Sequence, residues 1–297
     1  MSLKVSIHKT VLLNETIDGL KLKDKSVVLD ATFGGGGHSA EICKRYKQVK
    51  IIALDQDQSV WAKAKSEFKN LNCDVTFINI NFRDLNVLND SVDAIIFDLG
   101  LSSDQLENSG RGFSFMKDEP LIMTMKKNPS PEDITVLDIV NNWSEKSLAD
   151  IIYGYGEERF GRRIARGIVE ARMTKKIRTT FDLVGVINSS VPAAYKRKKI
   201  HFATRTFQAL RIAVNDELNT LQTGLEKGFI LLKSGGRVAT ISFHSLEDRV
   251  VKRFYKLKKE EGKAKLINKK PITASLEELK NNPRARSAKL RILEKIK

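Results

Sequence analysis

Short apolar runs, three of which end at or beside an acidic residue, recur along the first third of the chain, and segments with amphipathic helical spacing fill the intervals. The runs are residues 27–30, 50–55, 74–80 and 92–99. Strands that alternate with helices predict βαβ units and a parallel sheet covered on both faces. Ligands of such sheets bind at the carboxyl ends of the strands, so we expect Asp30, Asp55 and Asp98 to lie at one binding edge.

The glycine-rich segment VVLDATFGGGGHS joins the first run to a helix. Glycine lets the backbone turn sharply and approach a ligand, and Ser39 is expected to cap the helix behind it. Gly34 and Gly36 lack the third glycine of a dinucleotide fingerprint. Instead Asp30 precedes the glycines, as in S-adenosylmethionine-dependent methyltransferases. A carboxylate there repels a pyrophosphate but attracts a methionine ammonium and a sulfonium. A plain surface turn is the weaker alternative.

Two later positions fit the same nucleotide-like cofactor. Asp55 follows Gly34 by 21 positions, where nucleotide-binding folds place an acid on the ribose hydroxyls. Phe82, in the loop after the third run, offers a ring against which an adenine could pack. The sequence therefore predicts S-adenosyl-L-methionine as cofactor.

The pattern changes after Leu99. Residues 100–120 are rich in Gly, Ser and charge and predict a long functional loop, and helical spacing then dominates with no strand pattern before about residue 229. Ser130 and Pro131 are expected to start one helix. Two further helices are expected at 144–155 and 157–173. We therefore predict a discontinuous methyltransferase domain, 1–104 and 205–297, with an all-helical domain inserted at 105–204.

The last third of the sequence predicts further strands of the same sheet. The expected elements are a helix at 206–221, an apolar stretch with a Gly-Gly turn and a strand within 228–244, a basic helix at 246–259, a strand-like stretch at 264–272 and an edge strand at 288–296. The predicted fold is α/β, a Rossmann-like S-adenosylmethionine-dependent methyltransferase sheet with a helical insertion.

The positive charge is concentrated in two blocks. The net charge of the 297 residues is +16; residues 249–297 hold 17 Lys and Arg against 5 Glu, and residues 156–205 hold 13 against 4 acidic residues. Basic blocks on a mildly acidic body predict a polyanion partner, most simply RNA, although lysines also serve to solubilise a surface.

The composition of the chain limits the classes of protein to which it can belong. The chain is 41% hydrophobic, enough for a substantial core, and no apolar run approaches a membrane span or the core of a signal peptide. We therefore expect a cytoplasmic protein. Cys43 and Cys73 lack zinc spacing and are interpreted as core or surface thiols, and no metal ligand set is predicted. The early His8 is interpreted as a solvated or packed side chain.

Six phrases resemble the MraW/RsmH family of bacterial 16S rRNA cytosine-N(4) methyltransferases nearly from end to end. They are FGGGGHS (33–39), DLGLSSDQL (98–106), GYGEERFGRRIARGIVEAR (154–172), ATRTFQALRIAVNDEL (203–218), ISFHSLEDR (241–249) and NPRARSAKLR (282–291). The resemblance implies a substrate in the decoding region of the small subunit. It also implies cofactor contacts from Gly36, Gly37, His38, Asp55, Phe82, Asp98 and Gln105. The chain departs from the family pattern at Ile122, Thr124 and Phe202, which concerns the RNA contacts there.

The chemistry places demands on Asp98. The exocyclic amine of cytosine is a poor nucleophile, so orientation must supply much of the rate, and a hydrogen-bond acceptor aimed at the NH₂ would help. We expect Asp98 to be the catalytic residue that faces both the cofactor and the amine; a purely cofactor-binding Asp98 is the alternative. No conventional general base is required.

RNA contacts are expected from seven residues, each with a structural alternative. Phe243 and His244 could stack on the extruded base or pair with its edge, or Phe243 could be a core aromatic. Phosphate or base-edge candidates that could instead pair with Asp216, Glu247 or Asp248 are Arg205, Arg211 and Arg249. Arg284 and Arg286, after Pro283, are expected to clamp the RNA backbone.

The sequence thus predicts an enzyme that methylates the N(4) amine of a 16S rRNA cytidine within the small ribosomal subunit. One alternative is a non-catalytic rRNA-binding assembly factor with a relic cofactor pocket. A nucleotide-dependent oxidoreductase is disfavoured by Asp30 and the missing glycine. The oligomeric state stays open, with a homodimer among the options.

Overall fold

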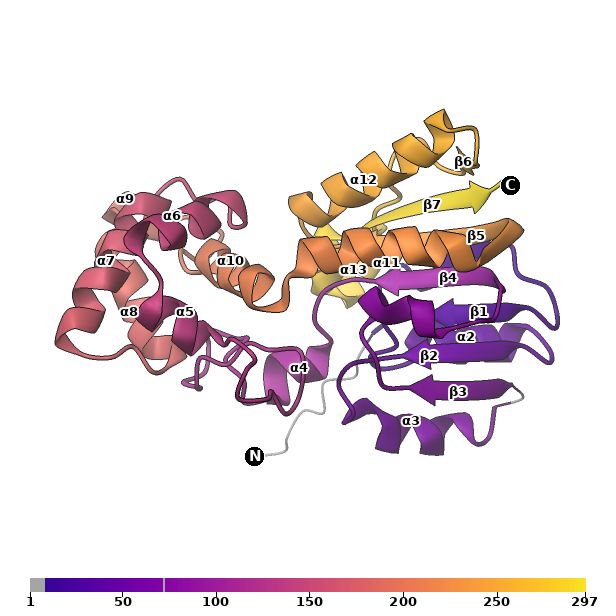
Figure 1. Cartoon of the computed structure of the whole chain (residues 1–297), viewed down its shortest axis with the longest axis horizontal. Helices are drawn as coiled ribbons and strands as arrows, with labels where there is room; N and C mark the ends of the chain where they lie inside the picture. Colours follow the sequence, from indigo (N-terminus) through magenta and orange to yellow (C-terminus); the bar gives the residue numbers. More distant parts are fainter. Residues whose placement is uncertain (1–8, 72) are drawn as a thin grey trace. The chain divides into compact units, whose positions relative to one another are not determined.

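The protein is described here from a computed structural model that covers residues 9–71 and 73–297 (Figure 1). His8 lies outside the described residues. The chain forms two compact units, Met1–Gly100 with Leu218–Lys297 and Leu101–Glu217. These divisions fall near the expected domain boundaries, 104/105 and 204/205, which stay a prediction.

One mixed sheet makes the first unit. Its strands are β1 (Val27–Asp30), β2 (Lys50–Leu54), β3 (Asp74–Ile78), β4 (Val92–Asp98), β5 (Leu232–Ser242), β6 (Ala264–Leu266) and β7 (Lys289–Lys295). In the described part of the chain the order is β3-β2-β1-β4-β5-β7-β6, with β3 to β5 parallel (Figure 1). The predicted α/β fold, with a helical unit inserted between β4 and β5, is confirmed.

Helices cover both faces of this sheet. They are α1 (Leu13–Leu20), α2 (Gly37–Arg45), α3 (Val60–Phe68), α11 (Glu217–Leu231), α12 (Ser245–Glu260) and α13 (Leu276–Asn281), with short 3₁₀ turns at Phe82–Val87 and Pro283–Ser287. Successive strand residues point to opposite faces, so Ala94 and Ile96 pack with α1 and α2, whereas Ile95 and Phe97 pack with α11 and α12. Burial on both faces explains the unbroken apolar runs.

The last strand does not lie at the edge. The sequence predicts an edge strand at 288–296, but β7 pairs antiparallel with β5 on one side and with β6 on the other. Glu294 accepts a hydrogen bond from Arg237 of β5 at 2.8 Å and forms an ion pair with Lys265 of β6 at 2.6 Å. The prediction of an edge strand was wrong. Alternation of apolar and polar side chains indicates which face of a strand is buried, but it does not indicate which strands pair with its backbone.

Two element boundaries also differ from the sequence pattern. The helix expected at 206–221 is two helices, α10 (Thr204–Asn215) and α11, because Asp216 adopts a left-handed conformation with φ 47°. The apolar stretch from Gly228 onward continues α11 to Leu231 before β5 begins. Gly228 fits closely against Ile95 of β4, where a Cβ would lie 3.3 Å from its side chain.

The two cysteines are bonded to each other, so the interpretation as thiols was wrong. Cys43 of α2 and Cys73 just before β3 form a disulfide with their Cα atoms 5.5 Å apart. The two cysteines are 30 positions apart in sequence. The disulfide can form only because α2 packs beside the β2–β3 region. The bond links the helix behind the glycine loop to the outer edge of the sheet.

We expect Cys73→Ser to lower the free energy of unfolding by about 3 kcal/mol, because a cross-link across 30 residues restricts the unfolded chain. Urea denaturation of the variant and of the wild type, each with and without reductant, measures the difference. Reductant should affect only the wild type. A wild-type midpoint that reductant leaves unchanged would contradict the expectation.

The second unit is helical and has its own core. Its helices are α4 (Ser103–Asn108), α5 (Val136–Asn142), α6 (Glu145–Gly154), α7 (Gly161–Thr174), α8 (Thr180–Ser190), α9 (Ala193–Lys196) and α10. Helix α5 starts later than expected because Thr135 and Asp138 form a capping box. Side chains such as Ile152, Ile164 and Leu210 fill the core. Across the described residues, no helix is long and apolar enough to cross a membrane.

Candidate active site

The glycine loop and Asp55 are tied together at the carboxyl ends of β1 and β2. Gly34 N donates to Asp55 Oδ2 at 2.9 Å, and Asp57 N donates to Oδ1 at 2.8 Å. The parallel pairing of Asp30 with Ala53 brings the two strand ends side by side. Each carboxylate oxygen can accept a further hydrogen bond, so Asp55 is suited to the predicted ribose contact, which stays a prediction.

Gly36 and Gly37 are required by their surroundings. Gly36 has φ 70°, and a Cβ on it would lie 2.5 Å from the Phe33 ring; a Cβ on Gly37 would lie 1.8 Å from Thr10 Oγ1. Helix α2 begins at Gly37 with Gly36 as its N-cap, so the predicted capping role of Ser39 was wrong. Its side chain lies inside the first turn, where its hydroxyl serves another partner.

That partner is Asp30, whose carboxyl points into the loop. Ser39 Oγ donates to Asp30 Oδ2 at 2.6 Å and Thr32 N donates to Oδ1 at 3.3 Å. Asp30 is only 2% exposed. Burial, aided by the charge of Asp55, raises the pKa of Asp30 to about 6 despite these hydrogen bonds. A nearby cation would stabilise the ionised form.

A raised pKa of Asp30 predicts a pH dependence of stability. Between about pH 4, where the unfolded carboxyl ionises, and about 6, the folded state binds more protons, so the free energy of unfolding falls as pH rises. The loss reaches about 3 kcal/mol above pH 6, from about two pKa units. Urea unfolding of the wild type and Asp30→Asn at pH 4.5 and 7 measures it. The difference between the two proteins should change with pH; a constant difference would contradict the assignment.

Asp98 ends β4 between β1 and β5, and it is the most unusual carboxyl of the site. Its backbone N donates to Thr32 Oγ1 at 2.6 Å, and its Oδ2 lies 3.6 Å from Nδ1 of the buried His38. Oδ1 is sealed from solvent and has no hydrogen-bond partner among the described residues, although the whole side chain keeps 23% of its surface. Burial and the charges of Asp30 and Glu247 raise the pKa of Asp98 well above its usual range.

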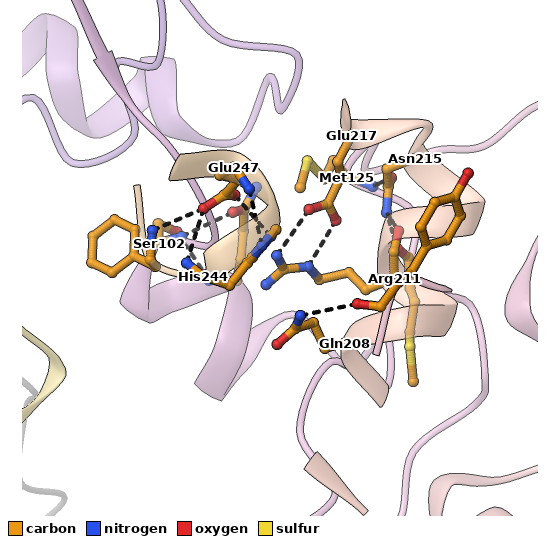
Figure 2. Close-up of polar contacts among 12 residues, drawn as sticks. Ser102, Met125, Gln208, Arg211, Asn215, Glu217, His244 and Glu247 are labelled. Atoms are coloured by element: carbon orange, nitrogen blue, oxygen red, sulfur yellow. Dashed lines mark hydrogen bonds and ion pairs between the residues drawn. The ribbon is translucent and has the colours of Figure 1, made fainter. Parts of the chain in front are cut away.

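The loop after β5 brings a further carboxylate to the same edge. Ile241 is the β5 partner of Asp98, so Phe243 and His244 follow beside the β4 end, with Phe243 close to Gly100. His244 is the N-cap of α12: Glu247 N donates to its Nδ1 at 3.3 Å, and Phe243 N donates to Glu247 Oε2 at 2.8 Å (Figure 2).

From the sequence, Glu247 was expected only as a possible partner of an arginine. In the structure it is a buried residue of this site. The pattern His-x-x-Glu does carry the spacing of a capping box, with histidine in place of the usual Ser or Thr. That spacing is the signal that could have found it. Its effect on the pKa of Asp98 requires the tertiary structure, since the two residues are far apart in sequence.

The acidic side chains at this edge fit S-adenosylmethionine. Asp30, Asp55, Asp98 and Glu247 are acidic and surround a glycine loop, which favours a cationic ligand over a pyrophosphate. The sealed Oδ1 of Asp98 is an acceptor in need of a donor or a positive charge.

Two predicted cofactor residues have other contacts. The Phe82 ring meets Phe97 edge-on at 5.5 Å, and Gly224 of α11 makes room for it, since a Cβ there would lie 2.5 Å from the ring. Gln105 lies in the second unit, where its Oε1 accepts from Ser102 N at 3.1 Å in the capping box of α4. Their cofactor contacts stay predictions.

Among the predicted RNA-binding arginines, Arg205 and Arg211 are half-buried and the other three are exposed. Arg211 donates from Nε and Nη2 to Glu217 at 2.7 and 2.9 Å (Figure 2), and Arg205 donates to Glu157 O at 2.9 Å. The alternative that Arg211 pairs with a nearby acid is confirmed, with Glu217 as the partner. The three exposed side chains are Arg249, Arg284 and Arg286.

The Arg211–Glu217 pair predicts a structural role for Arg211. The two side chains are 17% and 8% exposed, so Arg211→Ala leaves a largely buried carboxylate and is expected to lower the free energy of unfolding by about 3 kcal/mol. Urea denaturation measures it, with Lys146→Ala, which breaks an exposed pair with Asp150, as the near-neutral control. If Arg211→Ala instead keeps its stability and loses RNA affinity, Arg211 is an RNA contact.

Comparison with known proteins decides between the classes of enzyme. Residues 5–296 match the model of the MraW methylase family. The chain belongs to this family. Proteins named ribosomal RNA small subunit methyltransferase H from Acaryochloris marina and Nostoc punctiforme are each 47% identical over 97% of this chain and 94% of their own. The protein of that name from Lactobacillus johnsonii is 42% identical over 97% and 99%.

Membership of the MraW methylase family confirms the predicted methyltransferase and its cofactor, S-adenosylmethionine. It agrees with the acidic glycine loop and contradicts the oxidoreductase alternative. The edge that holds Asp30, Asp98 and Glu247 is the candidate site for this transfer, because it joins the glycine loop to the buried acceptor.

Proposed function

We propose that this methylase transfers the methyl group of S-adenosylmethionine to the exocyclic N(4) amine of a cytidine in the decoding region of 16S rRNA. The observation that carries the proposal is the carboxyl of Asp98 at the end of β4, which has an oxygen without a hydrogen-bond partner among the described residues and keeps 23% of its side-chain surface. The names of the curated relatives support ribosomal RNA of the small subunit as the substrate class.

Asp98 is suited to orient an amine. The Asp98 side chain keeps 23% of its surface, so its accessible part can accept an amine N–H and turn the nitrogen lone pair out of conjugation with the ring. S-adenosylmethionine supplies an electrophilic methyl group and leaves as the neutral thioether. The nitrogen gains the methyl and becomes a cationic N-methyl ammonium group. This strongly acidic cation then loses one proton to water, so no dedicated base is needed.

The loop after β5 is suited to hold the extruded base. Phe243 is partly buried beside Gly100, so its ring is the group suited to stack on the base. Both ring nitrogens of His244 face Glu247: Nδ1 accepts the N–H of Glu247 at 3.3 Å, and Nε2 lies 3.2 Å from Glu247 Oε1. Uracil lacks the exocyclic amine, so an acceptor at Asp98 favours cytosine.

The exposed arginines and the partner follow from the same proposal. Arg249, Arg284 and Arg286 contact phosphates of the rRNA, and the substrate in the cytoplasm is rRNA of the small subunit, either naked or assembled. The homodimer option has no support in the comparisons and stays a prediction.

The test is incubation of the protein with methyl-labelled S-adenosylmethionine and small subunits that lack their native modifications, followed by nucleoside analysis of 16S rRNA. We expect N(4)-methylcytidine at one site. Label in another nucleoside would overturn the assigned amine. No label, with cofactor still bound, would move the function to the assembly-factor alternative.

A further inference from the structure

Two aromatic rings of the second unit form a small platform between helices. Phe160, the N-cap of α7, and Tyr195 of α9 meet edge to face with ring centroids 5.0 Å apart. The two rings come from segments separated by 35 positions, and both belong to the basic block 156–205.

Three cationic side chains lie over these rings. The Arg159 guanidinium is 4.7 Å from the Phe160 centroid and 5.5 Å from that of Tyr195, while Arg163 lies 5.8 Å from Phe160 and Lys198 5.4 Å from Tyr195. All three cations are exposed. We call these three cations and two rings the cationic cluster. Contact with the rings limits the freedom of the side chains and leaves the N–H edges available.

One acid beside the platform has its partners inside the fold. Glu158 is fully buried, accepts a hydrogen bond from the Tyr195 hydroxyl, and accepts another from Phe160 N at 2.8 Å. Burial and Glu158 raise the pKa of Tyr195 to about 12, so its hydroxyl keeps the donating proton. Glu158 therefore fixes the positions of Phe160 and Tyr195 relative to each other.

The cations of the cluster differ from several other basic side chains of the second unit, which are paired with acids. In the described residues, none of the three forms an ion pair with an acidic side chain. By contrast, three exposed or largely exposed cations elsewhere in this unit do so, in the pairs Lys146–Asp150, Arg166–Glu145 and Lys175–Asp182. Charge that only solubilises a surface does not need to be assembled on rings and kept apart from acids.

We propose that the cationic cluster binds the phosphate backbone of the rRNA that flanks the methylated nucleotide. The inference rests on the proposed function and adds a second RNA-binding surface, on the helical unit, to the residues of the first. Phosphate fits better than a base, because the cations already cover the rings and a guanidinium edge can bind two phosphate oxygens.

The test compares two triple variants with equal loss of charge. The first is Arg159→Ala/Arg163→Ala/Lys198→Ala; the control is Lys146→Ala/Arg166→Ala/Lys175→Ala, whose cations are paired with acids. Affinity for unmodified small subunits is measured across a salt series, and KM and kcat are measured with the same subunits.

We expect the cluster variant to raise KM about tenfold or more with a smaller change in kcat, and to lower the slope of log K against log salt by about 2 to 3. The control should keep wild-type values. Equal slopes and equal KM for the two triple variants would overturn the inference.

Phe160→Leu provides a second variant that retains all three cations. Loss of the ring should weaken affinity severalfold at low salt with little change in slope, because charge is kept while its ordering is lost. Wild-type affinity in this variant would show that the rings play no part. If the wild-type protein methylates no small-subunit rRNA, the proposed function fails; if it does and only the cluster variants behave as wild type, the cluster alone is rejected.

Discussion

Asp98→Asn is expected to lower kcat for methyl transfer by about 10²- to 10³-fold, the range typical of removing one preorganised hydrogen-bonding group from an active site. Asparagine keeps the shape of Asp98 but loses the charged acceptor that is aimed at the amine. The same change should leave the fold as stable as the wild type or more stable. Burial and the charges of Asp30 and Glu247 disfavour the ionised carboxyl, and the amide removes that cost.

Opposite effects on activity and stability separate a catalytic carboxylate from a structural one. Asp93, at the other end of β4, is the matched control: it accepts from Val27 N at 2.7 Å and pairs with Lys233 at 2.9 Å. Asp93→Asn should lower stability and keep kcat. Single-turnover transfer to unmodified subunits and urea denaturation give the two readouts. Wild-type kcat in Asp98→Asn would reject the catalytic role and favour pure cofactor binding.

The pH profile gives an independent readout of Asp98. Since its pKa is raised, we expect kcat of the wild type to fall on the acid side at a pH well above the usual range of a carboxyl. Asp30 titrates at the same edge, so the limb belongs to the coupled carboxyls and not to one residue. The residual activity of Asp98→Asn should show a displaced limb.

Asp55→Asn is expected to weaken S-adenosylmethionine binding about 10- to 100-fold, equivalent to one or two hydrogen bonds to a charged acceptor. Both Asp55 oxygens accept backbone N–H groups, from Gly34 and Asp57, so an amide must turn its NH₂ toward one of these donors. The variant therefore disturbs the glycine loop as well as the ribose contact.

Titration calorimetry measures the affinity, and Asp74→Asn, an exposed carboxyl at the opposite end of β3, is the control expected to bind normally. A cofactor analogue without ribose hydroxyls separates the two effects of Asp55→Asn. If Asp55 holds the ribose, wild type and variant should differ less for the analogue than for the natural cofactor. An equal difference for both ligands would assign Asp55 to the loop alone.

Much of the first unit was predictable because its signals are local. Apolar runs flanked by helical spacing predicted the parallel strands, and Gly36 with Asp55 marked the carboxyl edge. Element ends were less predictable: capping at Thr135 and the left-handed Asp216 moved boundaries that hydrophobic spacing alone does not fix.

The sequence by itself determined the α/β class, the helical insertion, the cofactor loop and the basic blocks, since each is written in the spacing or charge of neighbouring residues. The tertiary structure decided the position of β7 inside the sheet, the Cys43–Cys73 bond and the Arg211–Glu217 pair. It also placed Glu247 where its charge acts on Asp98. The physical reason is that pairing, burial and pKa depend on neighbours brought together by folding, which spacing along the chain does not specify.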